Sequence, residues 1–429
     1  MQFYNYCSVN MCALVKANKI GYNDSWLYVN NKKPSPMKYL IFTIAIIMTT
    51  LSGMSASAND ASVHANVPIY LGTYTRGDDG AKGIYLTHLN SQNGSLSEPK
   101  LVAEVANPAF LAMHPTLPRL YAISEGGQGG SQIHAFTIDP STYALTKLNE
   151  QTVPARGACH LGVFPLPFVP NTPKKYAVMV AFYGEGAIAS LPLTDDGQLA
   201  PYATIHKHTG NGPTPRQRQA HAHAVYPIWK PFIVVVPDLG TDKLFFYSTL
   251  SDGKLAPYGE WKLPAGSGPR HAAFTARAQT AFILNELNST ITVAACTGSN
   301  VSPTVLRNEQ TISTLPEGTS GENNTTAEIF LHPNKRFVYA SNRGHDSIAL
   351  FHFDTMKRRI EFIETVSCGK HPRSFDISPD GKWLIVAAMQ DDRITTFRID
   401  PDTGRLTTTG HSIAVKQTAC VLPIVMKTP

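Results

Sequence analysis

The chain has 429 residues, with 37 lysines and arginines against 31 aspartates and glutamates, and a formal net charge of +6. Residues 1–58 hold five of the lysines and one aspartate, a net charge of +4, so the rest of the chain carries only +2. A nearly neutral chain lacks the basic footprint that binds nucleic acid, and we expect no nucleic-acid partner.

Residues 37–58 have the pattern of a secretory signal peptide. A lysine precedes an apolar run over residues 39–48, and the small residues Ala56 and Ala58 precede Asn59. The run is shorter than the about 20 apolar residues that span a bilayer. We therefore expect cleavage after Ala58, no stable membrane anchoring afterwards, and a periplasmic or secreted protein.

Residues 1–36 show no periodic apolar pattern, and we interpret them as an extension from a start codon that was assigned too early. The mature protein is then a single domain, residues 59–429. Its four cysteines are widely spaced and fit no zinc or redox motif: Cys159, Cys296, Cys368 and Cys420. Four single buried thiols are the simpler interpretation, although an exported compartment also permits a disulfide.

A phrase recurs seven times in the mature chain: an apolar, β-branched run, a polar turn and a second alternating run. The copies begin at residues 69, 120, 176, 233, 282, 338 and 384. Their spacing of roughly 50 residues is that of one four-stranded propeller blade. Turn-plus-leucine phrases between the copies, such as DDGQL at 195 and SDGKL at 251, add hairpin signals.

These repeats predict an all-β fold, a seven-bladed β-propeller with four-stranded antiparallel blades. A ring of blades leaves two open strand edges unless its ends pair. The segment near residues 67–75 lies one blade out of phase with the C-terminal segment, residues 407–425. We therefore expect N- and C-terminal strands to pair in one shared blade and close the ring.

Polar residues recur at matching places in the blades. The strand before each phrase begins with residues such as His160, His221, His223, Arg270, His271, Glu328 and Arg373, and the next strand ends in residues such as Tyr74, Glu125, Tyr183, Asp238, Glu286 and Arg343. The start of one antiparallel strand lies beside the end of the next. Both sets should meet at one rim, at the mouth of a central channel suited to a small ligand.

The sequence resembles the seven-bladed propeller lactonases, a family that includes bacterial 6-phosphogluconolactonases and fungal carboxy-cis,cis-muconate cyclases. The resemblance covers about residues 67–410 and is carried by long motifs. These include HAHAV at 221, VPDLGTDKL at 236, GPRHAAF at 268, NELNSTITV at 285 and YASNRGHDSIALF at 339. It implies hydrolysis of a lactone by an enzyme that needs no cofactor.

The resemblance also implies a catalytic group of one histidine, two arginines and one glutamate. Carried over by position, these are His223, Arg270, Glu286 and Arg343. We expect the substrate to be bound by His221, His160, Tyr183, Glu328, Arg373 and His271. Two departures from the family pattern put substrate contacts in question: Phe182 replaces the usual asparagine, and Met389 with Gln390 replaces a more polar rim.

Opening a lactone requires a base for water and a positive group or donor near the developing oxyanion. His223 and Glu286 are both candidates for the base. Flanking arginines should lower the pKa of Glu286, which favours His223 as the proton shuttle. The two arginines suit planar recognition of a carboxylate or phosphate.

Simpler structural roles remain for several of these residues. Arg270 and Glu286 could form an ion pair between blades, Asp238 and Asp346 could bond turn backbone, and His271 could be a satisfied core residue. The sequence contains no nucleophile elbow, zinc-protease motif, phosphate loop or dinucleotide fingerprint. We expect no metal, although His221 and His223 share a strand face and leave a metal site as an alternative.

The export signal bears on the substrate, because phosphorylated sugars are scarce outside the cytoplasmic membrane. An exported member should meet an unphosphorylated aldono-1,5-lactone such as gluconolactone, and we expect it to act as a monomer. A cyclase acting on a muconate derivative and a non-catalytic binding propeller remain alternatives from other classes.

Overall fold

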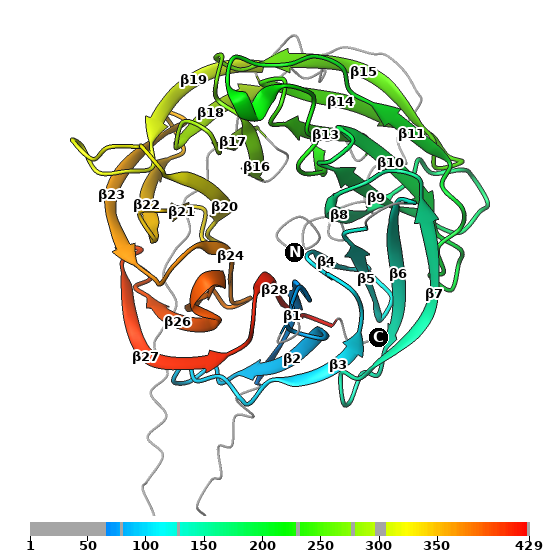
Figure 1. Ribbon diagram of the computed structural model, residues 1–429, viewed down its shortest axis with the longest axis horizontal. Helices are drawn as coiled ribbons and strands as arrows, with labels where there is room; N and C mark the ends of the chain where they lie inside the picture. Colours follow the sequence, from blue (N-terminus) through cyan, green and yellow to red (C-terminus); the bar gives the residue numbers. More distant parts are fainter. Residues whose placement is uncertain are drawn as a thin grey trace, which may run out of the picture. The chain divides into compact units, whose positions relative to one another are not determined.

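The computed structural model describes residues 66–77, 80–126, 129–228, 232–275, 279–296 and 306–426. These residues form seven four-stranded antiparallel sheets arranged as blades around a ring (Figure 1). The architecture confirms the seven-bladed propeller predicted from the repeats. The predicted extension at 1–36 and the signal peptide at 37–58 lie outside the described residues.

The blades follow one another along the chain, and each is given from its innermost strand outwards. The first consists of β28 (Thr418–Pro423), β1 (Val67–Thr73), β2 (Gly83–Leu89) and β3 (Lys100–Glu104). The second consists of β4 (Leu111–Met113), β5 (Arg119–Ser124), β6 (Ser131–Ile138) and β7 (Leu145–Val153). The third consists of β8 (Ala158–Pro165), β9 (Tyr176–Phe182), β10 (Ala187–Pro192) and β11 (Thr204–Lys207).

The remaining four blades repeat the same order. The fourth consists of β12 (Tyr226–Ile228), β13 (Ile233–Asp238), β14 (Lys243–Thr249) and β15 (Leu255–Lys262). The fifth consists of β16 (Pro269–Phe274), β17 (Thr280–Asn285), β18 (Thr290–Cys296) and β19 (Leu306–Ser313). The sixth consists of β20 (Thr325–Leu331), β21 (Phe337–Arg343), β22 (Ser347–Asp354) and β23 (Arg359–Ser367). The seventh consists of β24 (Pro372–Ile377), β25 (Trp383–Ala388), β26 (Arg393–Ile399) and β27 (Leu406–Ala414).

The ring is closed as predicted by pairing of the chain's two ends. Strand β1 pairs antiparallel with β28, with Ile69 opposite Pro423 and Leu71 opposite Val421. Only β28 takes part in this closure, because β27 completes the seventh blade. The shared blade covers the edge of β1 that would otherwise be open to another chain.

The core lies between neighbouring blades. All residues of β9 and β21 are buried, because each second strand packs against the blades on both sides. Ile123 of β5 shares one apolar cluster with Val180 of β9, and Tyr339 of β21 shares another with Phe375 of β24. Outer strands such as β15 are largely exposed instead. Continuous burial explains why the second strands read as unbroken apolar runs.

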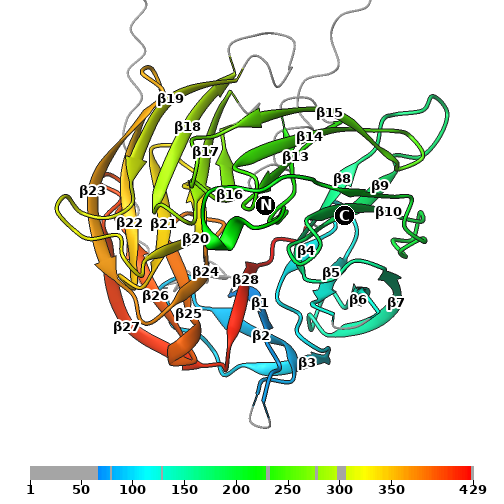
Figure 2. The same cartoon turned by 45° about the horizontal axis from the view of Figure 1, so that its top comes forward.

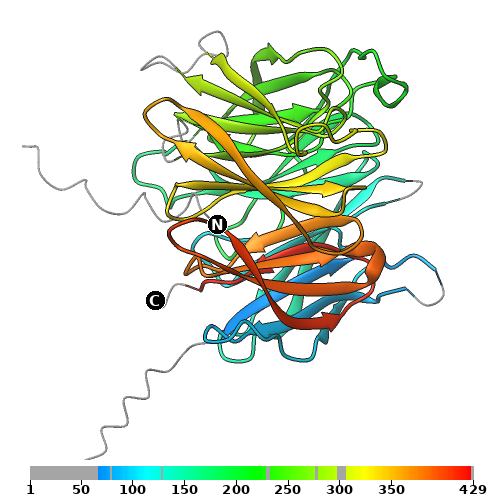
Figure 3. The ribbon, with the colours of Figure 1, turned by 90° about the vertical axis from the view of Figure 1, so that its left-hand side faces the viewer.

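The innermost strands face the centre of the ring (Figures 1 and 2). In the side view the strands run across the short dimension of the ring, so their ends lie at its two faces (Figure 3). Among the described residues, short 3-10 helices lie in two of the loops, η1 (Pro215–Gln217) before β12 and η4 (Met389–Asp391) after β25. Across the described ranges, no helix has the length and apolar character needed to cross a membrane.

Candidate active site

β-Bulges place several site residues on the innermost strands. Register shifts lie between Pro269 and His271 in β16 and between Pro372 and Ser374 in β24, so Arg270 and Arg373 are the extra residues. A longer irregularity between Thr326 and Ile329 in β20 contains Glu328. A bulge bends its strand and redirects the side chain it carries. The bulges therefore set the direction of three of the predicted site residues.

The ends of the second strands meet these bulges. Glu286 follows β17 and forms an ion pair with Arg270 at the start of β16. Arg343, at the end of β21, forms an ion pair with the same glutamate. Tyr183, after β9, lies against His221 and His223, which precede β12. These contacts confirm that strand starts and strand ends meet at one face of the ring.

Glu286 is the centre of what we call the glutamate–arginine cluster: Glu286, Arg216, Arg270 and Arg343. Its carboxylate lies 2.9 Å from Arg270 Nε, 3.1 Å from Arg343 Nη2 and 2.8 Å from Arg216 Nη1. Burial alone would raise the pKa of Glu286, but Arg343, Arg270 and Arg216 bring it down to about 2. Glu286 is therefore a carboxylate at neutral pH and a weak base.

Backbone carbonyls hold the two buried arginines of this cluster. Arg270 donates through Nη1 to the carbonyl of Ala327, and Arg343 donates through Nη2 to the carbonyl of Thr326, 2.7 Å away. Burial lowers the pKa of Arg343 to about 10 despite the opposing effect of Glu286. Both guanidinium groups stay charged at neutral pH and are fixed in position, as electrostatic stabilisation of an oxyanion requires.

Arg216 was not among the residues predicted from the sequence. It lies on η1, in the loop between β11 and β12, and donates to Glu286 and through Nη2 to the Tyr183 hydroxyl at 3.0 Å. The next residue, Gln217, is buried and donates to the Leu239 carbonyl and to Asp242 Oδ1, which anchors the loop. The only signal in the sequence was the dense Pro-Arg stretch PTPRQRQ just before HAHAV.

Beside this group lies the histidine cluster: His160, His221, His223 and His271. The His223 and His271 rings have centroids 5.4 Å apart, and His160 and His271 are 5.3 Å apart. His221 stacks on Tyr183 at 4.2 Å instead, with its Nδ1 2.8 Å from the Tyr183 carbonyl oxygen. All four residues were predicted at the site, and the structure brings them together.

The buried histidines are neutral at pH 7. Burial and then Arg270 hold the pKa of His223 and the pKa of His271 well below their usual range. Burial and then His271 do the same to the pKa of His160. A neutral imidazole has a free nitrogen lone pair, so His223 can accept a proton.

Glu328 is the partner of His271. Its Oε1 lies 2.7 Å from His271 Nδ1, and both side chains are buried. Burial raises the pKa of Glu328 to about 8, against the opposing effect of Arg270. The site thus contains two glutamates whose environments separate their pKa values widely, which is typical of acid–base sites.

Arg373 is the fourth arginine of the candidate site, and its partner is Tyr74. Its Nη2 donates to the Tyr74 hydroxyl at 2.8 Å, and its guanidinium lies 5.3 Å from the centre of the Tyr74 ring. Within the described ranges it forms no ion pair with a carboxylate. Glu286 and Glu125 are the carboxylates whose charge acts on Arg373. The four arginines outnumber these two carboxylates, and the excess positive charge suits an anionic ligand or product.

The family comparison agrees with this geometry. A profile of the family described as Lactonase, 7-bladed beta-propeller matches residues 68–423. The chain belongs to the seven-bladed β-propeller lactonase family. As the resemblance implied, this lactonase is an enzyme of the carboxylic-ester hydrolase class, and it is 6-phosphogluconolactonase-like.

Relatives with names support this assignment. The lactonase is 34% identical over 356 residues to a 6-phosphogluconolactonase of Bacillus subtilis, covering 82% of this chain and 97% of that protein. It is 26% identical to a 6-phosphogluconolactonase of Formosa agariphila, covering 79% and 94%. A solved structure of a periplasmic gluconolactonase from Pseudomonas aeruginosa superposes with a TM-score of 0.74 at 27% identity, covering 85% and 100%.

Several simpler predictions about the lactonase are confirmed. Asp238 accepts hydrogen bonds from the backbone of His221 and Thr241, and Asp346 accepts from the backbone of Gly344 and His371, so both aspartates organise turns. Cys159, Cys368 and Cys420 are free thiols. The side chain of the fourth cysteine, Cys296, lies outside the described residues.

The structure also shows where the departure at Phe182 lies and how the two histidines of the metal alternative are arranged. Phe182 is fully buried in the apolar core rather than presented at the site. His221 stacks on Tyr183, whereas His223 contacts the rings of both Tyr183 and His271. In the described part of the lactonase, no three or more His, Cys, Asp or Glu side chains are arranged so that they could hold one metal ion.

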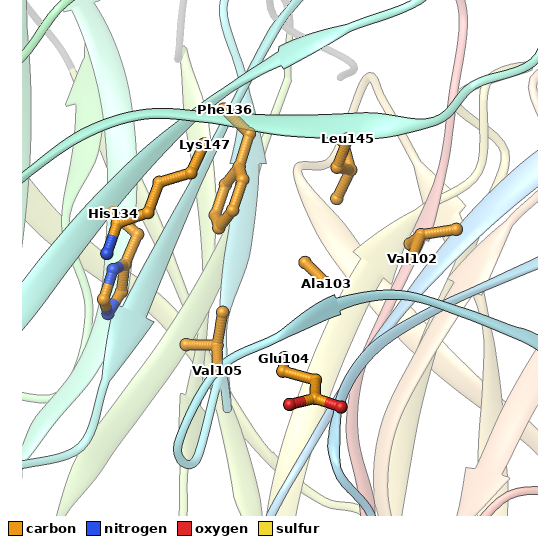
Figure 4. Close-up of a pocket in the computed structure, with 8 residues that line it drawn as sticks. All are labelled: Val102, Ala103, Glu104, Val105, His134, Phe136, Leu145 and Lys147. Atoms are coloured by element: carbon orange, nitrogen blue, oxygen red, sulfur yellow. The ribbon is translucent and has the colours of Figure 1, made fainter.

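A small pocket lies elsewhere in the lactonase, between the first two blades. It has a volume of about 230 Å³ and is lined by β3 with Val105, and by side chains of β6 and β7 such as His134 and Lys147 (Figure 4). None of the predicted site residues lines it. The charged residues of the candidate site, which come from several blades, lie outside this pocket.

Proposed function

We propose that this protein hydrolyses an aldono-1,5-lactone to the aldonic acid at the glutamate–arginine and histidine clusters. The observation that carries the proposal is the arrangement of Glu286. A buried carboxylate holds Arg270 and Arg343 in fixed positions next to a neutral His223. Such a site supplies positive charge for an oxyanion and a lone pair for a proton.

The roles of the residues follow from their charge states. Water attacks the lactone carbonyl while His223 accepts its proton, and Arg270 and Arg343 stabilise the oxyanion of the tetrahedral intermediate. Glu286, with its pKa near 2, orients the arginines rather than acting as the base. The ring oxygen then leaves with a proton, and the arginines bind the product carboxylate.

The substrate we favour is unphosphorylated gluconolactone. Two observations support it: the signal-peptide pattern of residues 37–58 and the likeness to a periplasmic gluconolactonase. The Bacillus relative favours the 6-phosphate instead, and the excess arginine charge would accommodate it. Comparing the two lactones is therefore part of the test.

We further propose that the protein is exported, loses residues 1–58 and works as a monomer. Expression from Met37, separation of the periplasmic fraction and N-terminal sequencing test the first two statements. A mature N-terminus at Asn59 is expected, and retention of residues 37–58 in the cytoplasmic fraction would contradict export. Light scattering of the purified protein tests the third.

The function is tested by pH-stat hydrolysis of glucono-1,5-lactone and of its 6-phosphate, with spontaneous hydrolysis subtracted. The chain from Asn59 is compared with two variants, Arg343→Ala and Arg336→Ala. Arg336→Ala is the control, because the Arg336 guanidinium donates to the Asp402 carbonyl outside the site. We expect turnover that Arg343→Ala loses and Arg336→Ala keeps. A folded protein without turnover on either lactone would redirect the assignment to a muconate-type cyclase or a binding propeller.

A further inference from the structure

We propose that Glu328 is the final proton acceptor of this site, acting through His271 and His223 without touching the substrate. The inference rests on the lactone hydrolysis proposed above and deepens it. It assigns Glu328 and His271 to a proton relay, whereas the sequence suggested only a role in substrate binding.

The first observation is the pairing of Glu328 with His271. Their 2.7 Å hydrogen bond joins two buried side chains on neighbouring innermost strands, β20 and β16. Glu328 Oε1 also accepts from the Ile329 backbone N–H at 3.2 Å, which fixes the carboxyl group. A carboxyl group that holds one imidazole nitrogen determines what the other nitrogen does.

The second observation is a matched pair of unpartnered atoms. His271 Nε2 and His223 Nδ1 are both buried, and neither has a hydrogen-bond partner among the described residues. They belong to rings whose centroids are 5.4 Å apart. Buried polar atoms without partners are rare and are often found at catalytic sites. One of these atoms can donate and the other can accept, and we infer that rotation of a ring brings them into a hydrogen bond.

The third observation concerns basicity. Three arginines keep the pKa of Glu286 near 2, and burial keeps the pKa of His223 low, so neither holds a proton well alone. Burial has the opposite effect on Glu328 and raises its pKa to about 8. The charged and titratable groups that face Glu328 and His271 are Arg270, Arg343, Arg373, Glu286, His160, His223, Tyr226 and Asp376.

The relay balances in both directions. In the active form the carboxyl group of Glu328 is ionised. As water adds to the lactone carbon, its proton passes to His223 Nε2, the Nδ1 proton of His223 passes to His271 Nε2, and the Nδ1 proton of His271 passes to the Glu328 carboxylate. When the bond from the carbonyl carbon to the ring oxygen breaks, the same transfers run backwards and deliver the proton to that oxygen. The product acid then releases its own proton to solvent.

The test compares the wild-type chain from Asn59 with Glu328→Gln, Glu328→Asp and a matched control, Glu150→Gln. Glu150 also pairs with a histidine, His134 at 3.0 Å, but far from the site in the outer strands of the second blade. Gluconolactone hydrolysis is followed from pH 5.5 to 8 and in mixtures of H2O and D2O. The two readouts are the pH profile of kcat and the dependence of rate on deuterium fraction.

The wild-type kcat should rise with pH toward an apparent pKa near 8, with a curved deuterium dependence from several protons in transfer. Glu328→Gln should lower kcat by about 10²-fold or more, the usual contribution of a general base. It should also remove that ionisation and make the deuterium dependence linear. Glu328→Asp should restore part of kcat with a shifted profile, and Glu150→Gln should match the wild type.

Three results would overturn the relay, and each has a different meaning. If the wild type is active and Glu328→Gln keeps its pH profile and curved deuterium dependence, the relay is wrong while lactone hydrolysis stands. If the folded wild type hydrolyses no lactone, the proposed function fails and the relay with it. A lowered kcat in Glu328→Gln with an unchanged pH profile would show a structural role only and also overturns the relay.

Discussion

Arg216 and Glu286 form an ion pair of 2.8 Å although they lie 70 residues apart, Arg216 in the loop between the third and fourth blades and Glu286 after β17 of the fifth. The two side chains differ in environment, since that of Glu286 is 3% exposed and that of Arg216 is 46% exposed. Arg216 is therefore the outer member of the glutamate–arginine cluster. Because it is the most exposed arginine of this cluster, we expect it to be the one that an entering ligand meets first.

Replacing Arg216 should weaken substrate binding without unfolding the protein. We expect Arg216→Met to lower kcat/KM for gluconolactone about 10- to 100-fold, mostly through KM, because a charge-assisted hydrogen bond of this kind contributes about 1.5–3 kcal/mol. Steady-state kinetics and thermal unfolding measure the two effects. Arg156→Met is the control, since Arg156 is exposed and pairs with Glu185 outside the site. An unchanged KM in Arg216→Met would contradict a role in binding.

Replacing Glu286 should destabilise the fold. Glu286→Gln leaves two buried guanidinium groups without their carboxylate, and breaking a buried pair in this way costs about 3–5 kcal/mol. Urea unfolding at pH 7 measures the loss. The matched control is Glu185→Gln, whose two ion pairs with Arg156 and Lys207 lie at the surface and should contribute about 1 kcal/mol or less. Equal losses in the two variants would show that the cluster is not a buried anchor.

Glu328 should make stability depend on pH in a definite direction. Its pKa is about 8 in the folded protein and about 4.5 as a free side chain, so the folded state binds the proton more tightly. Above about pH 4.5 the unfolded chain loses this proton first, and stability falls as pH rises toward 8. Glu328→Gln should therefore match the wild type at pH 4.5 and exceed it by about 2 kcal/mol or more at pH 7.5. Urea unfolding at both pH values measures the two free energies of unfolding. The same difference between the variant and the wild type at both pH values would contradict the raised pKa.

Ring closure by β28 should be essential for solubility. A chain that ends at Val415 lacks β28, exposes the paired edge of β1 and uncovers Leu71 and the apolar residues packed beside it. We expect this chain to aggregate, because an open, apolar strand edge templates further pairing. A chain that ends at Met426 keeps all of β28 and serves as the control. Soluble, monomeric protein from the shorter chain would show that the other blades hold the ring together.

The number of blades, the closure of the ring and the ten proposed residues of the candidate site could all be inferred from the sequence. The physical reason is that these features are local or periodic. Alternating apolar runs with turn signals repeat about every 50 residues, and an antiparallel pair brings a strand's start beside the next strand's end whatever surrounds it. His223, Arg270, Glu286 and Arg343 could thus be placed at one rim from their positions in the repeats.

Which of these groups touch, and what charge each carries, could be seen only in the folded chain. Arg216 stands in a loop without a repeat, and the bulges at Arg270 and Arg373 leave no mark in the apolar pattern. The partners Tyr74 and Arg373 are 299 residues apart. Two buried glutamates, Glu286 and Glu328, have pKa values near 2 and near 8, because three arginines surround the first while burial dominates at the second. Such differences depend on distances between blades, which sequence patterns do not contain.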